Sequence, residues 1–177
     1  AWLPVVDLVI PDKVLDALPR LTVSLGAIWG EFDRPHPDPA VQEAVNRIQS
    51  VEQTLAIIDA CRANGMLSVN VDLIYGLPKQ SLEGFARTLD TVIVARPHRL
   101  AVYSYAHLPE LFKPQRQLNA DFLPTAELKL ELLQLAIEKL TAAGYVYIGM
   151  DHFALPDDEL ALAQQRGSLH RNFMGYT

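Results

Sequence analysis

The feature that most constrains the fold is a regular alternation of strand-like and helix-like segments. Short apolar, β-prone runs lie near residues 22, 70, 101 and 147. Between them, apolar residues recur at helical spacing. Strands that are separated by helices form successive βα units, and such units build a parallel sheet. The sequence therefore predicts an α/β fold with parallel strands and outer helices.

The expected helices have clear start and stop signals. Asp38-Pro39 is a typical N-cap and first-turn pair, Asn64-Gly65 a typical stop, and Thr125 and Gly144 a typical N-cap and terminator. Proline and glycine between residues 27 and 38 favour a loop there. The first helical stretch is predicted to begin near residue 38 and to end near residue 65. Further helices are predicted over 81–95, 125–143 and 156–165.

Length and composition narrow the class of protein. The chain has 177 residues, enough for one domain but fewer than the about 250 of a complete (β/α)₈ barrel. It has no apolar run of the roughly 18 residues that a membrane span needs, so we expect no membrane partner. A net charge of −6 argues against nucleic acid as a partner. The first residue is not methionine, from which we expect a truncated or processed piece of a longer protein.

Cysteine usage limits redox and metal chemistry. Cys61 is the one cysteine, so the chain cannot form an internal disulfide or a cysteine-rich metal site. This composition fits the cytoplasm. Cys61 lies on an apolar helix stripe, which predicts a small buried residue rather than a nucleophile.

Polar residues follow the apolar strands. The strand before the Gly76-Leu77-Pro78 turn is expected at 68–75, with Asp72 near its carboxyl end. Ala106 follows the next strand, and Asp151-His152 follow the last. Functional residues of parallel sheets gather at the carboxyl ends of the strands, so we expect these residues to share a site. Asp72 suits a turn as well as it suits a ligand.

Two pairs allow more than one interpretation. Asp151 and His152 could form an acid/base pair or part of a metal site, but structural or substrate-proximal roles are favoured, because adjacent residues point in different directions. His170 and Arg171 could bind carboxylates, or could belong to a loop held by hydrogen bonds.

Several stretches together resemble one family of enzymes. From about Asp38 to its end, the chain is similar to the oxygen-independent coproporphyrinogen III oxidases, which are radical S-adenosylmethionine enzymes of haem biosynthesis. The stretches that carry the resemblance are 44–49 (AVNRIQ), 70–80 (NVDLIYGLPKQ), 105–109 (YAHLP), 149–154 (GMDHFA) and 170–176 (HRNFMGY).

The resemblance implies a partial (β/α) radical S-adenosylmethionine barrel. Residues 38–177 would form its middle and later part as a single domain, and residues 1–37 a divergent N-terminal segment with one strand. The implied reaction is the oxidative decarboxylation of two propionates of coproporphyrinogen III to vinyl groups, giving protoporphyrinogen IX through a 5′-deoxyadenosyl radical. The implied cofactors are S-adenosylmethionine and a [4Fe-4S] cluster, in a parent protein that is a cytoplasmic monomer.

The resemblance also implies site residues. Arg47, Asp72 and Ala106 fall at positions where the family binds S-adenosylmethionine. A carboxylate suits ribose hydroxyls or an amino group, and an arginine suits the methionine carboxylate. His152, His170 and Arg171 would lie near the substrate.

The sequence departs from the family pattern in several places. The Cys-x3-Cys-x2-Cys cluster motif is not present, the glutamine expected after Gly26 has no counterpart, and Leu155 and Met174 replace an arginine and a glutamine. We therefore expect this chain to be an inactive fragment or degraded copy of the enzyme, without metal ligands of its own. The alternative is a non-catalytic half-barrel that binds a tetrapyrrole or a nucleotide.

Overall fold

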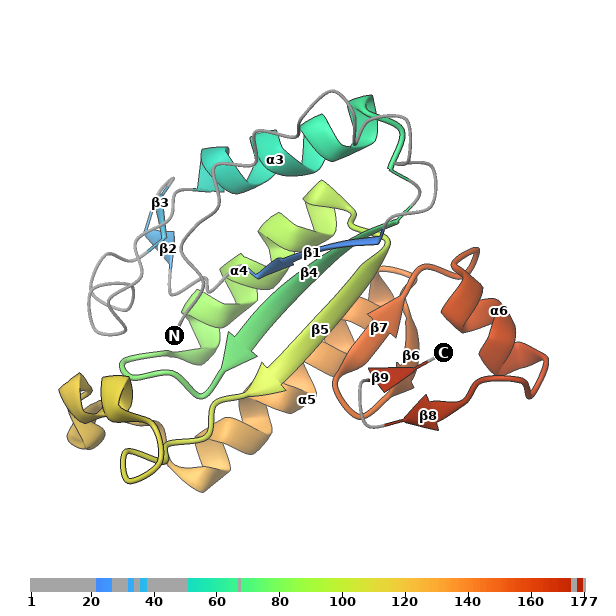
Figure 1. The fold of residues 1–177 in the computed structure, drawn as a ribbon. Helices are drawn as coiled ribbons and strands as arrows, with labels where there is room; N and C mark the ends of the chain where they lie inside the picture. The colour runs from blue at the N-terminus through green and yellow to red at the C-terminus, as the bar shows by residue number, and fades with distance from the viewer. Residues whose placement is uncertain are drawn as a thin grey trace.

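The fold is a sheet with helices packed against it (Figure 1). The computed structural model describes residues 22–26, 32–33, 36–37, 51–66, 68–172 and 175–176. The main sheet has five strands in the order β1-β4-β5-β7-β6. These strands are β1 Thr22–Gly26, β4 Ser68–Tyr75, β5 Arg99–Ser104, β6 Val146–Gly149 and β7 His152–Ala154.

Most predicted helices are confirmed within a few residues. They are α3 Val51–Ala63, α4 Leu82–Ala95, α5 Ala126–Ala142 and α6 Glu159–Gln165. Ser81 caps α4 by accepting from the Gly84 amide, and Thr125 caps α5 by accepting from the Leu128 amide. The helix expected from Asp38 onwards lies outside the described residues.

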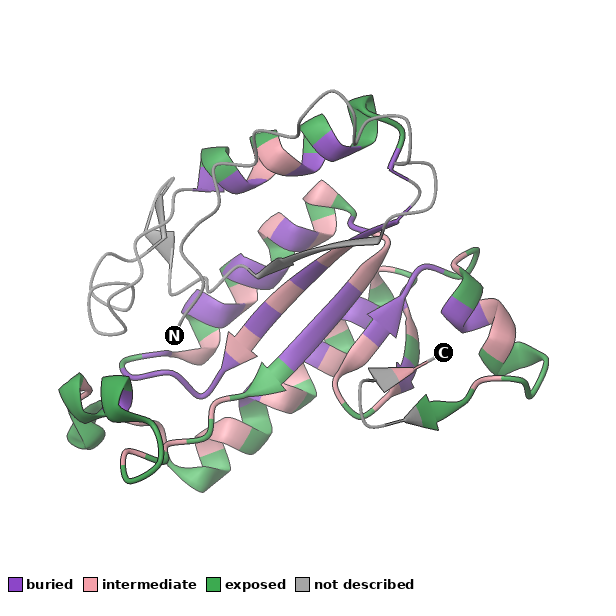
Figure 2. Ribbon diagram, viewed as in Figure 1, coloured by how far each residue is buried: buried purple, intermediate pink, exposed green. Residues whose placement is uncertain are grey.

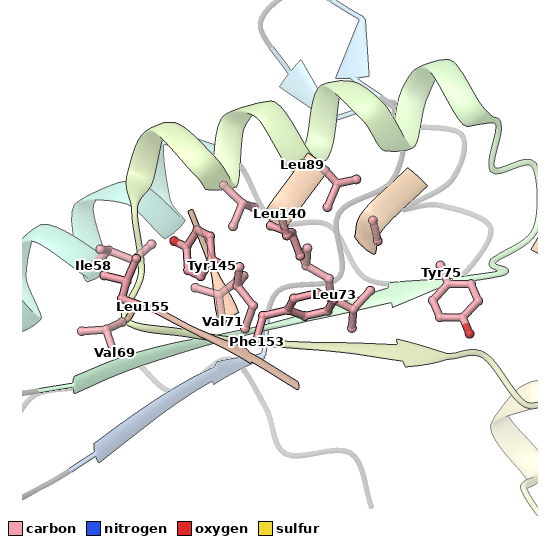
Figure 3. Close-up of a cluster of buried hydrophobic side chains, with 14 of the residues drawn as sticks. Ile58, Val69, Val71, Leu73, Tyr75, Leu89, Leu140, Tyr145, Phe153 and Leu155 are labelled. Atoms are coloured by element: carbon pink, nitrogen blue, oxygen red, sulfur yellow. The ribbon is translucent and has the colours of Figure 1, made fainter. Parts of the chain in front are cut away.

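The core lies on one face of the sheet, beneath α3, α4 and α5. Burial alternates along β4, as Figure 2 shows, because successive side chains point to opposite faces. Figure 3 shows Val71, Leu73 and Phe153 on the helix side of the strands, together with Leu89 of α4 and Leu140 of α5. The opposite face, called the second face below, carries Asn70, Asp72, Tyr103 and His152, the side chains of β4, β5 and β7 that alternate with this core.

Strand directions confirm the prediction for one half of the sheet and correct it for the other. β1, β4 and β5 are parallel neighbours. The sequence predicts that the strand near 147 continues this parallel sheet directly, which is wrong. β6 runs in the direction of β5, but β7 lies between them and is antiparallel to both. The chain reverses immediately after β6, where Gly149 and Met150 have φ angles of 137° and 49°.

One further local prediction is confirmed and another is wrong. The strand expected at 68–75 is confirmed, since β4 covers Ser68–Tyr75, and Asp72 lies three residues before its end. The segment expected as a loop between 27 and 38 contains a short antiparallel pair, β2 Phe32–Asp33 and β3 His36–Pro37.

The connection after β5 contains two short 3₁₀ helices, η2 Lys113–Gln117 and η3 Ala120–Phe122. Near the carboxyl end of the chain, β8 Arg171–Asn172 and β9 Gly175–Tyr176 form a hairpin. Among the described helices, none combines the length and the apolar character that crossing a membrane requires.

Candidate functional site

Asp72 and His152 lie in one row across the second face of the sheet. In register, Asp72 pairs with Gly26 on one side and with Ala101 on the other, and Ala101 pairs with His152. Side chains at paired positions point to the same face. Ala101 is small and fully buried, so Asp72 and His152 flank it, with their Cα atoms about 10 Å apart, or two strand spacings.

Two tyrosine rings hold the His152 imidazole. Its ring centroid lies 6.1 Å from that of Tyr103 and 5.3 Å from that of Tyr176, both in edge-on geometry. Gly149 makes room for this arrangement, because a Cβ atom there would lie 2.8 Å from the Tyr176 hydroxyl. Within the described part of the chain, the buried Nδ1 atom of His152 has no hydrogen-bond partner.

Burial and the nearby carboxylates shift the pKa values of His152 and Tyr103. Burial lowers the pKa of His152, while the carboxylates of Asp151 and Asp72 act in the opposite direction. The pKa of Tyr103 is raised, first by burial and then by the same two carboxylates. His152 is therefore held in its neutral form near two negative charges, where it can exchange hydrogen bonds with a polar ligand.

The turn after β4 is shaped by a buried glutamine. Gln80 Oε1 accepts from the Gly76 amide at 2.7 Å and from the Leu77 amide at 3.3 Å. Its Nε2 donates to the Ile74 carbonyl at 3.3 Å. Gly76 has a φ of 83°, a conformation that favours glycine. This turn is therefore fixed by side-chain hydrogen bonds, beyond the end of the sheet ladder.

The segment after β5 carries Ala106, which is exposed. Lys129 of α5 donates from Nζ to the Tyr105 carbonyl at 2.8 Å. Gln115 donates from Nε2 to the Ala106 carbonyl at 2.9 Å and accepts from the Leu108 amide at 2.5 Å. Three consecutive peptide groups around Ala106 are thus held by side chains from elsewhere in the chain.

The structure places the other expected site residues in different surroundings. Asp151 lies in the turn between β6 and β7, close enough to influence His152 and Tyr103. His170 and Arg171 are exposed, Arg171 at the start of β8. Arg47 and Met174 lie outside the described residues. The described residues thus bring Asp72 and His152 into one row, and place Ala106 two residues beyond β5.

Four residues of this region are not expected from the sequence: Gln80, Gln115, Lys129 and Tyr176. Glutamine and lysine are mostly exposed in proteins, so their types gave no signal of a buried role. The position of Gln80 just after Gly76-Leu77-Pro78 is the one local signal that was present. Tyr103, expected as a core residue, is 39% exposed and belongs to the second face.

Comparison with known proteins gives consistent results. No family model matches. The oxygen-independent coproporphyrinogen III oxidase of Pseudomonas aeruginosa is 61% identical over 140 residues, which are 79% of this chain and 30% of that protein. The protein of that name from Escherichia coli is 54% identical over 137 residues, 77% of this chain and 30% of that protein.

A solved structure has the same fold. It is the coproporphyrinogen III oxidase of Escherichia coli, described as a radical SAM enzyme, with a TM-score of 0.82 and 48% identity. The match covers 93% of this chain and 37% of that one. This chain spans about 30% of the length of the curated relatives it matches.

Proposed function

This chain belongs to the family of oxygen-independent coproporphyrinogen III oxidases, and on that basis we propose that it forms the S-adenosylmethionine-binding part of an enzyme that oxidises coproporphyrinogen III in haem biosynthesis. The match at 61% identity over 140 residues carries the proposal. We propose further that the enzyme is a cytoplasmic monomer without nucleic-acid or membrane partners.

The residues expected to bind the cofactor have side chains that suit S-adenosylmethionine. The Asp72 carboxylate can accept hydrogen bonds from ribose hydroxyls or from an amino group, and Ala106 offers a small side chain and an exposed backbone. We assign Arg47 to the methionine carboxylate. S-adenosylmethionine in radical enzymes supplies the abstraction of a hydrogen atom from the substrate, and the protein positions it and excludes water.

We propose substrate-proximal roles for His152, His170 and Arg171. The neutral imidazole of His152 can offer its Nε2 to the substrate, as a donor or an acceptor according to the tautomer. The cationic Arg171 suits the carboxylates of the substrate.

The chain's own residues do not fit an iron–sulfur cluster. Such clusters are held by several cysteine thiolates. Cys61 is the one cysteine of the sequence and is 3% exposed in the core. Burial raises its pKa, which disfavours the thiolate. Within the described ranges, no three His, Cys, Asp or Glu residues gather into a possible metal site. We therefore propose that a cluster in the whole enzyme is held outside these 177 residues.

A chimera tests the proposed function. The Pseudomonas aeruginosa relative keeps its own residues outside the matched region and receives the matched 140 residues from this chain. We expect the chimera to oxidise coproporphyrinogen III without oxygen. Asp72→Asn should lower kcat/KM at least tenfold, because an amide in place of the carboxylate loses charge-assisted hydrogen bonds. The exposed Asp121→Asn is the matched control. A folded chimera without activity would contradict the proposal.

The alternative is a non-catalytic half-barrel that binds a tetrapyrrole or a nucleotide. Ligand binding without activity distinguishes this alternative from the proposed enzyme. Binding of coproporphyrinogen III or of S-adenosylmethionine to a folded but inactive chimera would favour this alternative.

A further inference from the structure

The peptide group between Tyr105 and Ala106 has its two polar ends in different situations. Its carbonyl, on Tyr105, accepts from Lys129 Nζ at 2.8 Å. No hydrogen bond within the described part of the chain uses its N–H, on Ala106. Because the C=O and N–H of a trans peptide point in opposite directions, the ammonium on one end fixes the direction of the other. The direction of this N–H donor is therefore fixed before any acceptor binds.

Lys129 reaches this carbonyl by a specific route. It starts on α5 and runs across Gly76, where a Cβ atom would lie 2.7 Å from Lys129 Cε. A glycine at this position therefore gives the lysine stem its path between the two strand-end segments. The positive charge also polarises the peptide group and strengthens its N–H as a donor.

Gln115 fixes the next peptide groups. Its amide donates to the Ala106 carbonyl and accepts from the Leu108 amide, and Gln115 is 8% exposed. With the Ala106 carbonyl occupied, the Ala106 N–H is the backbone group of that residue left for a ligand. The Tyr105 amide continues the sheet by donating to the Tyr75 carbonyl at 2.8 Å, which anchors the start of the segment.

We propose that Lys129 and Gln115 are positioning residues that present the Ala106 N–H to a hydrogen-bond acceptor on the adenosine part of S-adenosylmethionine. The ligand in this inference rests on the proposed function, whereas the positioning itself can be measured without a ligand. Neither side chain touches the ligand; each acts through the backbone that it holds.

Lys129→Met is the test variant, because methionine keeps most of the stem over Gly76 and removes the ammonium. The exposed Lys113→Met is the matched control. In the 177-residue chain, ¹⁵N relaxation should give Ala106 an order parameter near the rigid value of about 0.85, and a clearly lower value in Lys129→Met. An order parameter unchanged in Lys129→Met overturns the proposal, whether or not a ligand binds.

Calorimetric titration with two ligands tests the role in binding. Lys129→Met should raise the Kd of S-adenosylmethionine and of S-adenosylhomocysteine by the same factor, about tenfold for a displaced hydrogen-bond donor. The two ligands share the adenosine but differ in the charge on sulfur. Unequal changes would mean a direct charge effect of Lys129 and would overturn positioning. If the unaltered chain binds neither ligand, the proposed cofactor site fails, while the relaxation result still decides the positioning.

Gln115→Glu provides a second, independent variant. Glutamate keeps an oxygen for the Leu108 amide but places another oxygen against the Ala106 carbonyl. We expect the same loss of order at Ala106 and faster hydrogen exchange at Leu108, with the exposed Gln117→Glu unchanged. Slow Leu108 exchange and an ordered Ala106 in Gln115→Glu would contradict the role of Gln115.

Discussion

His152, the first residue of the three-residue strand β7, is half-buried and lies near two aromatic rings and two carboxylates. Neither a family pattern nor composition predicts the tyrosine rings around it, because Tyr103 and Tyr176 are 49 and 24 residues away in the sequence. What the sequence does predict is that His152 follows an apolar strand. The rest depends on strand register, which places His152 level with Ala101.

His152 makes stability depend on pH. Its pKa is lowered in the folded state, so the unfolded chain binds a proton first as the pH falls below about 6.5. Its contribution to stability is therefore complete above that pH and is lost as the pH falls toward the folded-state pKa, with a slope of at most about 1.4 kcal/mol per pH unit. The groups that face it are Asp72, Asp151, Tyr103 and Tyr176.

Urea unfolding between pH 7.5 and 5.5 checks this prediction. The unaltered chain should lose more unfolding free energy over this range than His152→Gln, which cannot titrate. His170→Gln, at an exposed position, should behave like the unaltered chain. Equal losses for the unaltered chain and His152→Gln would contradict the prediction.

At the scale of elements, the local signals predicted most of the helices and strands. Ser81 and Thr125 act as N-caps, and β4 and β5 are parallel as the βα alternation requires. β7 was not predicted, because it is three residues long and follows a turn that contains Met150 at positive φ rather than an Asn-Gly or Asp-Gly pair. Whether so short a segment forms a strand depends on its pairing with neighbouring strands of the sheet.

α6 is joined to the sheet by an ion pair. Arg99 Nε lies 2.9 Å from Asp158 Oδ2, and its Nη2 lies 2.6 Å from Glu159 Oε1. Burial alone would lower the pKa of Arg99, but the hydrogen bonds and charges of Asp158 and Glu159 outweigh it and raise the pKa. Asp158 is also the N-cap of α6, accepting from the Leu160 amide.

Arg99→Met should therefore destabilise the protein strongly. The Asp158 side chain is 4% exposed, so the substitution leaves a buried carboxylate without its partner, at a cost of about 3 kcal/mol. Chemical unfolding measures this difference. The exposed Arg166→Met, at the end of α6, should change stability by less than about 0.5 kcal/mol. A loss below 1 kcal/mol in Arg99→Met would show that the ion pair is not needed to hold α6.

At the scale of the whole molecule, one large apolar layer lies between the helices and the sheet. Leu132 and Leu130 lie two residues apart on α5, but Leu132 is fully buried and Leu130 is 67% exposed. Leu132→Ala should cost about 2–5 kcal/mol, because it removes buried methyl groups and leaves a void. Leu130→Ala should stay within about 0.5 kcal/mol.

Equilibrium unfolding in urea compares the two variants. The same slope with urea and a lower midpoint for Leu132→Ala would assign the loss to the folded core. Similar midpoints for both variants would mean that α5 does not pack as the structure has it. The helical pattern of α5 predicts which of the two leucines faces inward, whereas the sheet face that receives it follows from the strand order.

The row of paired residues across the second face also limits which substitutions this sequence can accept during evolution. Gly26, Ala101 and Gly149 occupy three of its five positions, alternating with Asp72 and His152. At Gly149, even a methyl group would meet the Tyr176 hydroxyl. Substitutions that exposed helix positions tolerate should therefore be rejected at Gly149 and at the fully buried Ala101, and a deep mutational scan should find these two among the least replaceable of the described positions.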